Sequence, residues 1–273
     1  MMRAIEANWD ARTPVHVASD FYGVDSRDPE FWFADFEWGD LGELDGRDVL
    51  HLQCHLGTET AAFARRGART VGLDLSGAAV AQARQLARRK GLSIEYVQAN
   101  VFDAVEALGR RRFDVVYTGK GSLVYVPDLV RWMGVVAELL RPGGLLYVVE
   151  FHPVLTSLGL VPSPEDGDTL ALRYDYLPGR GPVEVKSPYT YTDGPPLVEA
   201  HLSYEWPHGL GELVNAVAGA GLRVTTLRES ELAPWPRWPR MLPTERGWFR
   251  LPDQEPRVPL LYALRAVAPG SGT

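Results

Sequence analysis

The residues with the clearest chemical pattern are a turn and an acid, each of which follows a short apolar run. The first run, 48–52, leads into the turn 53–57 and then into a helix rich in small residues. The second run, 70–73, ends in Asp74, 17 residues after Gly57. A strand, a turn at a helix N-terminus and a second strand ending in an acid form a nucleotide-binding unit. Its turn suits the polar tail of a cofactor, and its acid can accept hydrogen bonds from a ribose diol.

The turn departs from the G-x-G-x-x-G pattern of dinucleotide sites. Its three corresponding positions are Gln53, His55 and Gly57, so only one glycine remains. The two longer side chains would crowd a diphosphate, which needs close approach to the backbone. A cofactor without phosphate fits better. S-adenosylmethionine (SAM) is such a cofactor, and its ribose would lie by Asp74 and its amino-acid end by the turn.

The chain resembles class I SAM-dependent methyltransferases over nearly its whole length. It closely resembles a bacterial subgroup whose first motif reads HLQCH-x-G where most relatives have an acid and three glycines. The matching segments are WDARTPVH (9–16), HLQCHLG (51–57), GLDLS (72–76), FDVVYT (113–118), LRPGG (140–144), EFHP (150–153), YEWPH (204–208) and GW (247–248). The resemblance implies an α/β, Rossmann-like fold with a seven-stranded, mostly parallel sheet and helices on both faces. It also implies SAM as cofactor.

The composition is that of an ordinary soluble globular protein, with 45% hydrophobic and 23% charged residues among 273. The net charge is −7, and the main basic cluster, 84–90, has the spacing of a solvated helix face, so no nucleic-acid partner is expected. The single cysteine, Cys54, excludes an internal disulfide. Since no apolar run reaches the ~20 residues of a membrane span and no signal core is present, we expect a cytoplasmic protein without a membrane partner.

Three regions are distinguished by their patterns. Residues 1–40 are crowded with aromatic side chains and are interpreted as a lid over SAM and the acceptor, or alternatively as a cap packed on the core. Residues 41–153 and 201–273 form the SAM-binding core. Residues 154–200 are rich in proline and glycine and are interpreted as an insertion after the fifth strand, over the acceptor site or as a dimer-forming flap. We expect a monomer or a homodimer.

Apolar runs alternate with helical stretches through the core, as in a doubly wound parallel sheet. Within the insertion, 173–176 and 189–191 alternate like the strands of a small hairpin. The predicted core strands are 49–52, 70–74, 94–98, 113–117, 145–150, 222–227 and 259–267, and the predicted helices are 58–66, 78–90, 129–140 and 208–220. Ser76 is the predicted N-cap of the helix 78–90, residues 141–144 are a predicted turn, and 201–206 are a further predicted strand.

The turn after the third strand is expected to hold adenine, as the resemblance implies. Asn100 stands where relatives usually carry an acid, and an amide oxygen can accept the same hydrogen bond from the adenine amino group. Val101 or Phe102 could sandwich the ring. The alternative for Asn100 is a turn-forming residue.

Further cofactor contacts are expected at the end of the fourth strand and in the lid. Thr118 and Gly119 lie where ligands bind at the carboxyl edge of open α/β sheets. Arg12 could pair with the SAM carboxylate. Trp9 and Leu75, which belong to the matching segments, complete the expected set.

Methyl transfer from SAM is an in-line displacement, and a hydroxyl acceptor usually also needs a base. His152 is the first candidate, because it directly follows the fifth strand and a histidine has an ordinary pKa of about 6.5. His201 and His16 are further candidates. The alternative for each is a structural histidine. No spacing of ligands indicates a metal site.

The leading hypothesis is a SAM-dependent methyltransferase acting on a small, aromatic or apolar molecule by O-, N- or C-methylation. The abundance of aromatic residues favours such an acceptor. The N-P-P-Y-type signature of enzymes that methylate amide or base nitrogens does not follow the fourth strand, which argues against those two classes. One alternative is a nucleotide-dependent oxidoreductase, against which the side chains of Gln53 and His55 argue. Another is a non-catalytic SAM-fold binding protein.

Overall fold

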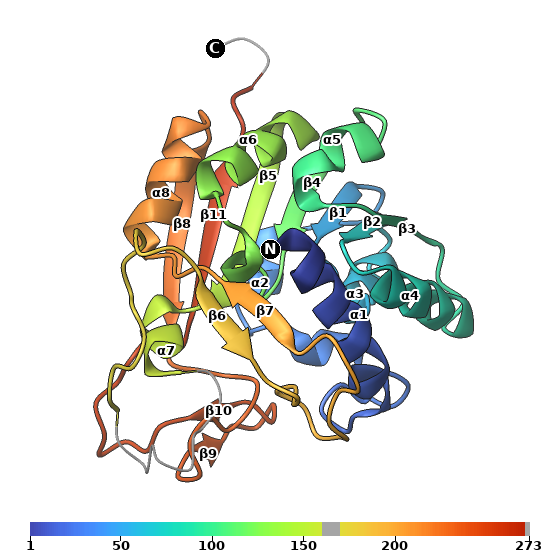
Figure 1. Cartoon of the computed structure of the whole chain (residues 1–273). Helices are drawn as coiled ribbons and strands as arrows, with labels where there is room; N and C mark the ends of the chain where they lie inside the picture. Colours follow the sequence, from blue (N-terminus) through green and yellow to red (C-terminus); the bar gives the residue numbers. More distant parts are fainter. Residues whose placement is uncertain (160–169, 271–273) are drawn as a thin grey trace.

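The computed structural model describes residues 1–159 and 170–270, and its centre is a seven-stranded sheet in the order β3-β2-β1-β4-β5-β11-β8 (Figure 1). Strands β1 to β5 are parallel, whereas β11 is antiparallel to both of its neighbours, β5 and β8. This confirms the predicted α/β fold. The strands are β1 (Asp48–Leu52), β2 (Arg69–Asp74), β3 (Ile94–Gln98), β4 (Phe113–Thr118), β5 (Leu140–Phe151), β8 (Arg223–Ser230) and β11 (Leu261–Val267).

Helices cover both faces of the sheet. One face packs against α5, α6 and α8, and the other against α2, α3 and the aromatic residues 31–33. The helices are α1 (Met2–Ala18), α2 (Glu37–Leu41), α3 (Thr58–Arg65), α4 (Gly77–Arg89), α5 (Ala104–Ala107), α6 (Leu129–Leu139), α7 (Pro153–Leu158) and α8 (Leu210–Gly219), with the 3₁₀ turns η1 (Pro29–Trp32), η2 (Val101–Asp103) and η3 (Leu123–Tyr125). No helix in the described part of the chain is both long enough and apolar enough to cross a bilayer.

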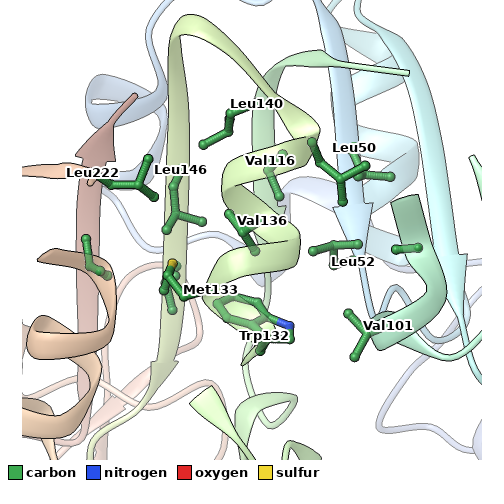
Figure 2. Packing of buried hydrophobic residues seen from close by; sticks show 14 of the residues in the cluster. Leu50, Leu52, Val101, Val116, Trp132, Met133, Val136, Leu140, Leu146 and Leu222 are labelled. Carbon is green, nitrogen blue, oxygen red and sulfur yellow. The ribbon is translucent and has the colours of Figure 1, made fainter. Parts of the chain in front are cut away.

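The larger core lies between α6 and the parallel strands. Figure 2 shows Trp132, Met133 and Val136 of α6 facing Leu50 of β1 and Leu146 of β5. All five side chains are buried. The residues of α6 have helical spacing, and the residues of β1 and β5 alternate between the two faces of the sheet, as the sequence shows. This packing holds the carboxyl ends of β1, β2 and β4 side by side, at the edge where the candidate residues cluster.

Most predicted boundaries agree with the structure. The third strand has the predicted bounds, and Ser76 is the predicted N-cap of α4, since its Oγ accepts from the backbone N–H of Ala79 at 3.0 Å. One difference is β5, which starts at Leu140 and includes the predicted turn 141–144. A register shift in its pairing with β4 accommodates the extra residues.

The N-terminal segment is more regular than its sequence pattern indicates, because residues 2–18 form the single helix α1. Its buried residues Ile5, Asn8, Arg12, Thr13 and His16 have helical spacing, but four of the five are polar. A periodicity of buried polar residues is invisible to a hydrophobicity pattern. The helix lies against α4 and β7.

The predicted hairpin of 173–176 with 189–191 is wrong. The insertion instead pairs β6 (Val183–Lys186) with β7 (Leu202–Glu205) in a separate antiparallel sheet. Period-two alternation of tyrosines indicates an extended chain but does not identify its partner strand. The hairpin lies in front of the main sheet beside α1 (Figure 1). A further small sheet joins β9 (Leu242–Pro243) to β10 (Phe249–Arg250).

The division into lid, core and insertion stays a prediction. The hairpin crosses the expected boundary at 200, because β7 belongs with β6 and not with the main sheet. Part of the expected insertion, 160–169, lies outside the described residues.

Candidate functional site

The turn after β1 keeps a glycine-type backbone although two of its glycines are replaced. The φ angles of Gln53, His55 and Gly57 are 55°, 47° and 75°, all in the left-handed region. For a residue other than glycine this conformation costs roughly 1–2 kcal/mol. Such strain persists only where the surrounding structure imposes it, and it is found mostly at functional sites.

Asp74, at the end of β2, is one group that holds this turn. One of its oxygens accepts from the backbone N–H of His55 at 2.7 Å, and the other accepts from the N–H of Ser76 at 2.9 Å. A carboxylate offers about four lone-pair sites, so the two oxygens can still accept hydroxyl donors. Burial raises the pKa of Asp74 to about 6, and the nearby charge of Asp10 acts in the same direction.

Helix α1 is attached directly above this turn. Asp10 accepts from the hydroxyl of Ser76 at 2.6 Å and from the backbone N–H of Ala78 at 3.0 Å, so it binds α1 to the start of α4. The same helix brings Trp9 to a ring distance of 4.9 Å from His55. The N-terminal helix and the turn after β1 are therefore in contact in this structure.

His16 lies in the same cluster and not at a separate catalytic position. Its Nδ1 is 2.9 Å from Nε2 of His55, within one hydrogen bond. Burial lowers the pKa of His16 to about 2 and the pKa of His55 to about 3, and the charge of Arg12 lowers both further. Both rings are neutral near pH 7. Since Nδ1 of His16 is occupied by His55, the contact is part of the turn cluster, and a catalytic role for His16 stays a prediction.

Several buried polar atoms around α1, the turn and β7 have no hydrogen-bond partner among the described residues. The largest of these groups is the guanidinium of Arg12. The residue is only 5% exposed, and its Nε is unpaired. Buried polar groups are normally hydrogen bonded, so a concentration of unpaired ones indicates a place where a polar ligand binds. The atoms are Asn8 Oδ1, Arg12 Nε, His16 Nε2, Gln53 Oε1, His55 Nδ1 and Ser203 Oγ.

The residues expected around adenine form a tight turn. The side-chain oxygen of Asn100 accepts from the backbone N–H of Phe102 at 3.0 Å and caps η2, which is the turn-forming role considered as the alternative. Val101 is buried in the core beneath, and Phe102 packs under the guanidinium of Arg131 at 4.4 Å. Leu75 is half-buried next to Asp74. A cofactor role for these residues stays a prediction.

The loop after β4 is organised by a carboxylate that sequence reasoning did not assign to the cofactor site. Glu150, at the end of β5, accepts backbone N–H groups from Gly121, from Ser122 at 2.8 Å, from Leu123 at 2.9 Å and from Phe151 at 2.6 Å. Burial raises the pKa of Glu150, and these bonds oppose the shift. The sequence signal that could have identified Glu150 is an acid at the carboxyl end of a central strand.

Thr118 and Gly119 lie in that loop, beside the turn. The hydroxyl of Thr118 is 2.8 Å from the hydroxyl of Ser122. The backbone carbonyl of Ser122 in turn accepts a hydrogen bond from the side-chain amide of Gln53 at 2.8 Å. A Cβ on Gly119 would lie 3.5 Å from Glu59 Oε1 and 3.6 Å from His51 Nε2. Gly119 therefore faces two polar groups and also the ring of Tyr117, whose Cε1 lies 3.5 Å from the same position.

His152 is placed apart from this cluster, and both of its ring nitrogens are used. Nδ1 accepts from the backbone N–H of Val154 at 3.0 Å and caps α7, while Nε2 is 2.9 Å from Oε1 of Glu229 on β8. With Nδ1 accepting, the ring proton is on Nε2, so no free lone pair remains for a base. The proposed catalytic role is therefore corrected to a structural one. Burial also lowers its pKa.

We expect His152→Ala to lower the free energy of unfolding by about 1 kcal/mol, the usual value of a helix N-cap. It should leave ligand binding at the β1 turn unchanged. Urea denaturation measures the first effect, and His152→Asn, which can still cap the helix, is the control that should recover most of it. A loss of ligand affinity at unchanged stability would contradict the structural role.

His201 also makes a structural contact. It precedes β7 within the predicted strand 201–206, and its Nε2 donates to the carbonyl of Leu197 at 3.0 Å. The described residues contain no group of three or more histidines, cysteines or acids arranged to hold a metal ion. The structure thus brings together Trp9, Arg12, His16, the turn and Asp74, but neither His152 nor His201.

Comparison with known proteins gives two findings about sequence. Residues 49–144 match the model of a methyltransferase domain family. A ubiquinone biosynthesis O-methyltransferase of Actinobacillus pleuropneumoniae is 34% identical over 121 residues, which cover 43% of this chain and 51% of that protein. The chain thus spans about half the length of the curated relatives that it matches.

Solved structures extend the likeness to most of the chain. A SAM-dependent methyltransferase from Listeria monocytogenes superposes with a TM-score of 0.60 at 20% identity, covering 84% of this chain and 93% of that one. A second, from Clostridium acetobutylicum, gives 0.57 at 15% identity, covering 92% and 96%. At these identities the likeness shows that the chain has the fold of these methyltransferases.

Proposed function

We propose that this chain is a SAM-dependent methyltransferase acting on a small aromatic or apolar molecule, by O-, N- or C-methylation. The observation that carries the proposal is the presence of two groups at the turn: the Asp74 carboxylate at the end of β2, which binds the backbone of His55, and the buried guanidinium of Arg12, whose Nε has no partner among the described residues. The matching methyltransferase domain and the O-methyltransferase relatives support the same reaction class.

The groups present fit the chemistry of SAM. A carboxylate with free lone pairs suits the ribose hydroxyls, and a buried guanidinium suits the carboxylate of the methionine part. The unpaired amide oxygen of Gln53 and the polar surroundings of Gly119 supply further acceptors near the turn. When bound, SAM supplies a methyl group that is already activated by a sulfonium.

The work left to the protein is to align the acceptor and exclude water. Alignment converts a bimolecular step into an effectively intramolecular one. Helix α1 and the β6–β7 hairpin contact each other over the carboxyl edge of the sheet, where they can shield the reacting atoms. Trp9, Tyr22, Tyr125 and Tyr191 give this cover an aromatic inner surface.

The test is a calorimetric titration of the purified protein with S-adenosylhomocysteine (SAH), the product of SAM, beside NAD⁺. We expect saturable binding of SAH and no binding heat with NAD⁺. Binding of NAD⁺ would revive the oxidoreductase alternative, and failure to bind SAH would overturn the methyltransferase proposal. Binding of SAH without turnover of any acceptor would favour the non-catalytic binding protein.

The remaining expectations are proposals of the same kind. We propose that the enzyme works in the cytoplasm as a monomer or homodimer, with a small-molecule acceptor and without a nucleic-acid partner. The net charge of −7 supports the last point, because nucleic-acid binding depends on a concentration of basic residues.

A further inference from the structure

One face of β7 is turned toward α1 and η3. Side chains alternate along a strand, so Ser203 and Glu205 share a face. Ser203 is fully buried, and the carboxylate of Glu205 accepts from the hydroxyl of Tyr125 in η3 at 3.3 Å. The next residue, Trp206, donates its backbone N–H to the carbonyl of Val124 at 2.7 Å, which fixes the strand against η3.

Two aromatic rings connect this face to the cofactor turn. Tyr125 lies 5.3 Å from Trp9, and Trp9 lies 4.9 Å from His55, each pair nearly edge to face. Glu205 is thus linked to the turn through Tyr125, Trp9 and His55. A flat aromatic molecule held against Trp9 and Tyr125 would contact ring surfaces, and stacked or edge-to-face ring pairs contribute about 0.5–1.5 kcal/mol beyond burial.

The polar groups on this face are suited to a ligand. The Ser203 hydroxyl and Arg12 Nε have no partner among the described residues, and both residues are at least nine-tenths buried. The hydrogen bond from Tyr125 is the only one that the described residues make to the Glu205 side chain. Burial raises the pKa of Glu205, while the charge of Arg12 and the bond from Tyr125 oppose that shift.

We propose that Glu205 is the general base of the transfer and that the acceptor is a hydroxyl on an aromatic ring held against Trp9 and Tyr125. This inference rests on the proposed function. Of the three histidines that the sequence offered, His152 has no free nitrogen, while His201 and His16 each use one ring nitrogen, in contacts with Leu197 and His55.

The proposed step is balanced in atoms and charge. An oxygen lone pair of the acceptor forms the new O–CH₃ bond as the S–CH₃ bond breaks, and the pair of that bond stays on sulfur as a neutral thioether. The hydroxyl proton passes to the Glu205 carboxylate, which becomes a carboxylic acid and later returns the proton to water. Tyr125 is a positioning residue, because its hydroxyl orients the carboxylate.

The experiment measures SAH formation from SAM with catechol as probe acceptor, for the wild-type protein, Glu205→Gln and the control Glu184→Gln. Glu184 is an exposed residue on the neighbouring strand β6, and the strand register places it opposite Tyr204 of β7. We expect Glu205→Gln to lower kcat/KM by about 100-fold or more, the usual contribution of a general base. Its SAH affinity should change by less than about twofold, and Glu184→Gln should behave as wild type.

A pH profile separates a base from a structural residue. Wild-type kcat/KM should fall on the acidic side as both Asp74 and Glu205 are protonated, so the alkaline side of the profile is the part that distinguishes the variant. The Glu205→Gln enzyme should instead gain about tenfold per pH unit toward alkaline pH, because the phenolate then forms without a base. Retention of activity within about threefold would overturn the proposal, as would SAH binding without methylation of catechol. Absence of SAH binding would instead overturn the proposed function itself.

Discussion

Asp74→Ala is expected to weaken SAH binding by about 1.5–3 kcal/mol, the value of a charge-assisted hydrogen bond, or roughly ten- to hundred-fold in Kd. The carboxylate accepts from the backbone N–H groups of His55 and Ser76 and has lone pairs left for the ribose. Its removal therefore takes away a ligand contact and also one restraint on the strained turn. Isothermal titration measures the affinity.

The control for this variant is Glu106→Ala, which removes an exposed carboxylate of α5 that pairs with Arg110 at 2.6 Å. It should bind SAH as the wild type does. Asp74→Asn removes the charge and one backbone hydrogen bond together, since an amide keeps one acceptor oxygen and cannot satisfy both backbone donors. An Asp74→Ala protein that is folded and binds SAH normally would show that the ribose assignment is wrong.

The pKa of Asp74 predicts how the binding of SAH depends on pH. Burial raises the pKa of Asp74 from 3.8 to about 6, so between these values the folded protein holds a proton that the unfolded chain has lost. The contribution of Asp74 to the free energy of unfolding therefore falls as the pH rises from 3.8 to about 6. SAH binding, which uses the carboxylate, should weaken as pH falls below about 6, by up to about tenfold per unit. Asp74→Asn should remove this dependence.

Gly57→Ala is expected to lower the free energy of unfolding by at least about 2 kcal/mol. The φ angle of Gly57 is +75°, which strains any other residue, and a Cβ there would overlap the hydroxyl of Tyr96 and lie 2.9 Å from its Cζ. The turn would have to move away from Tyr96, so SAH binding should weaken as well. Urea denaturation and the SAH titration measure the two effects.

Gly91 provides a matched control for that variant. It also has a left-handed backbone, with φ +65°, but no atom lies within 4 Å of the position of its missing Cβ. Gly91→Ala should therefore cost only the conformational strain, about 1 kcal/mol. Equal losses for the two variants would mean that Tyr96 does not confine the turn. Adding Tyr96→Phe to Gly57→Ala should recover part of the difference.

The sheet could be predicted closely because its signals are local. Parallel strands buried on both faces appear as apolar runs, and Ser76 marks the start of α4 by its own hydrogen bond to the backbone. The turn 53–57 and Asp74 were found in the same way, from residues at the ends of consecutive strands.

The lid and the insertion resisted prediction for a different reason. The buried face of α1 is polar, so its period is hidden, and the partner of β7 is chosen by packing on α1 and η3. His152 was correctly placed at the end of β5, but the Glu229 carboxylate that binds its second nitrogen lies 77 residues away in sequence. No local pattern contains that contact.

The sequence by itself determined the strands and helices of the main sheet and the residues at its carboxyl edge, because propensity, capping and burial periods act over a few residues. Only the tertiary structure decided which of those residues meet. Helix α1 places His16 on His55, 39 positions apart, and the β6–β7 hairpin brings Glu205 to Tyr125, 80 positions apart. Burial at these contacts then sets the protonation states on which the proposed chemistry depends.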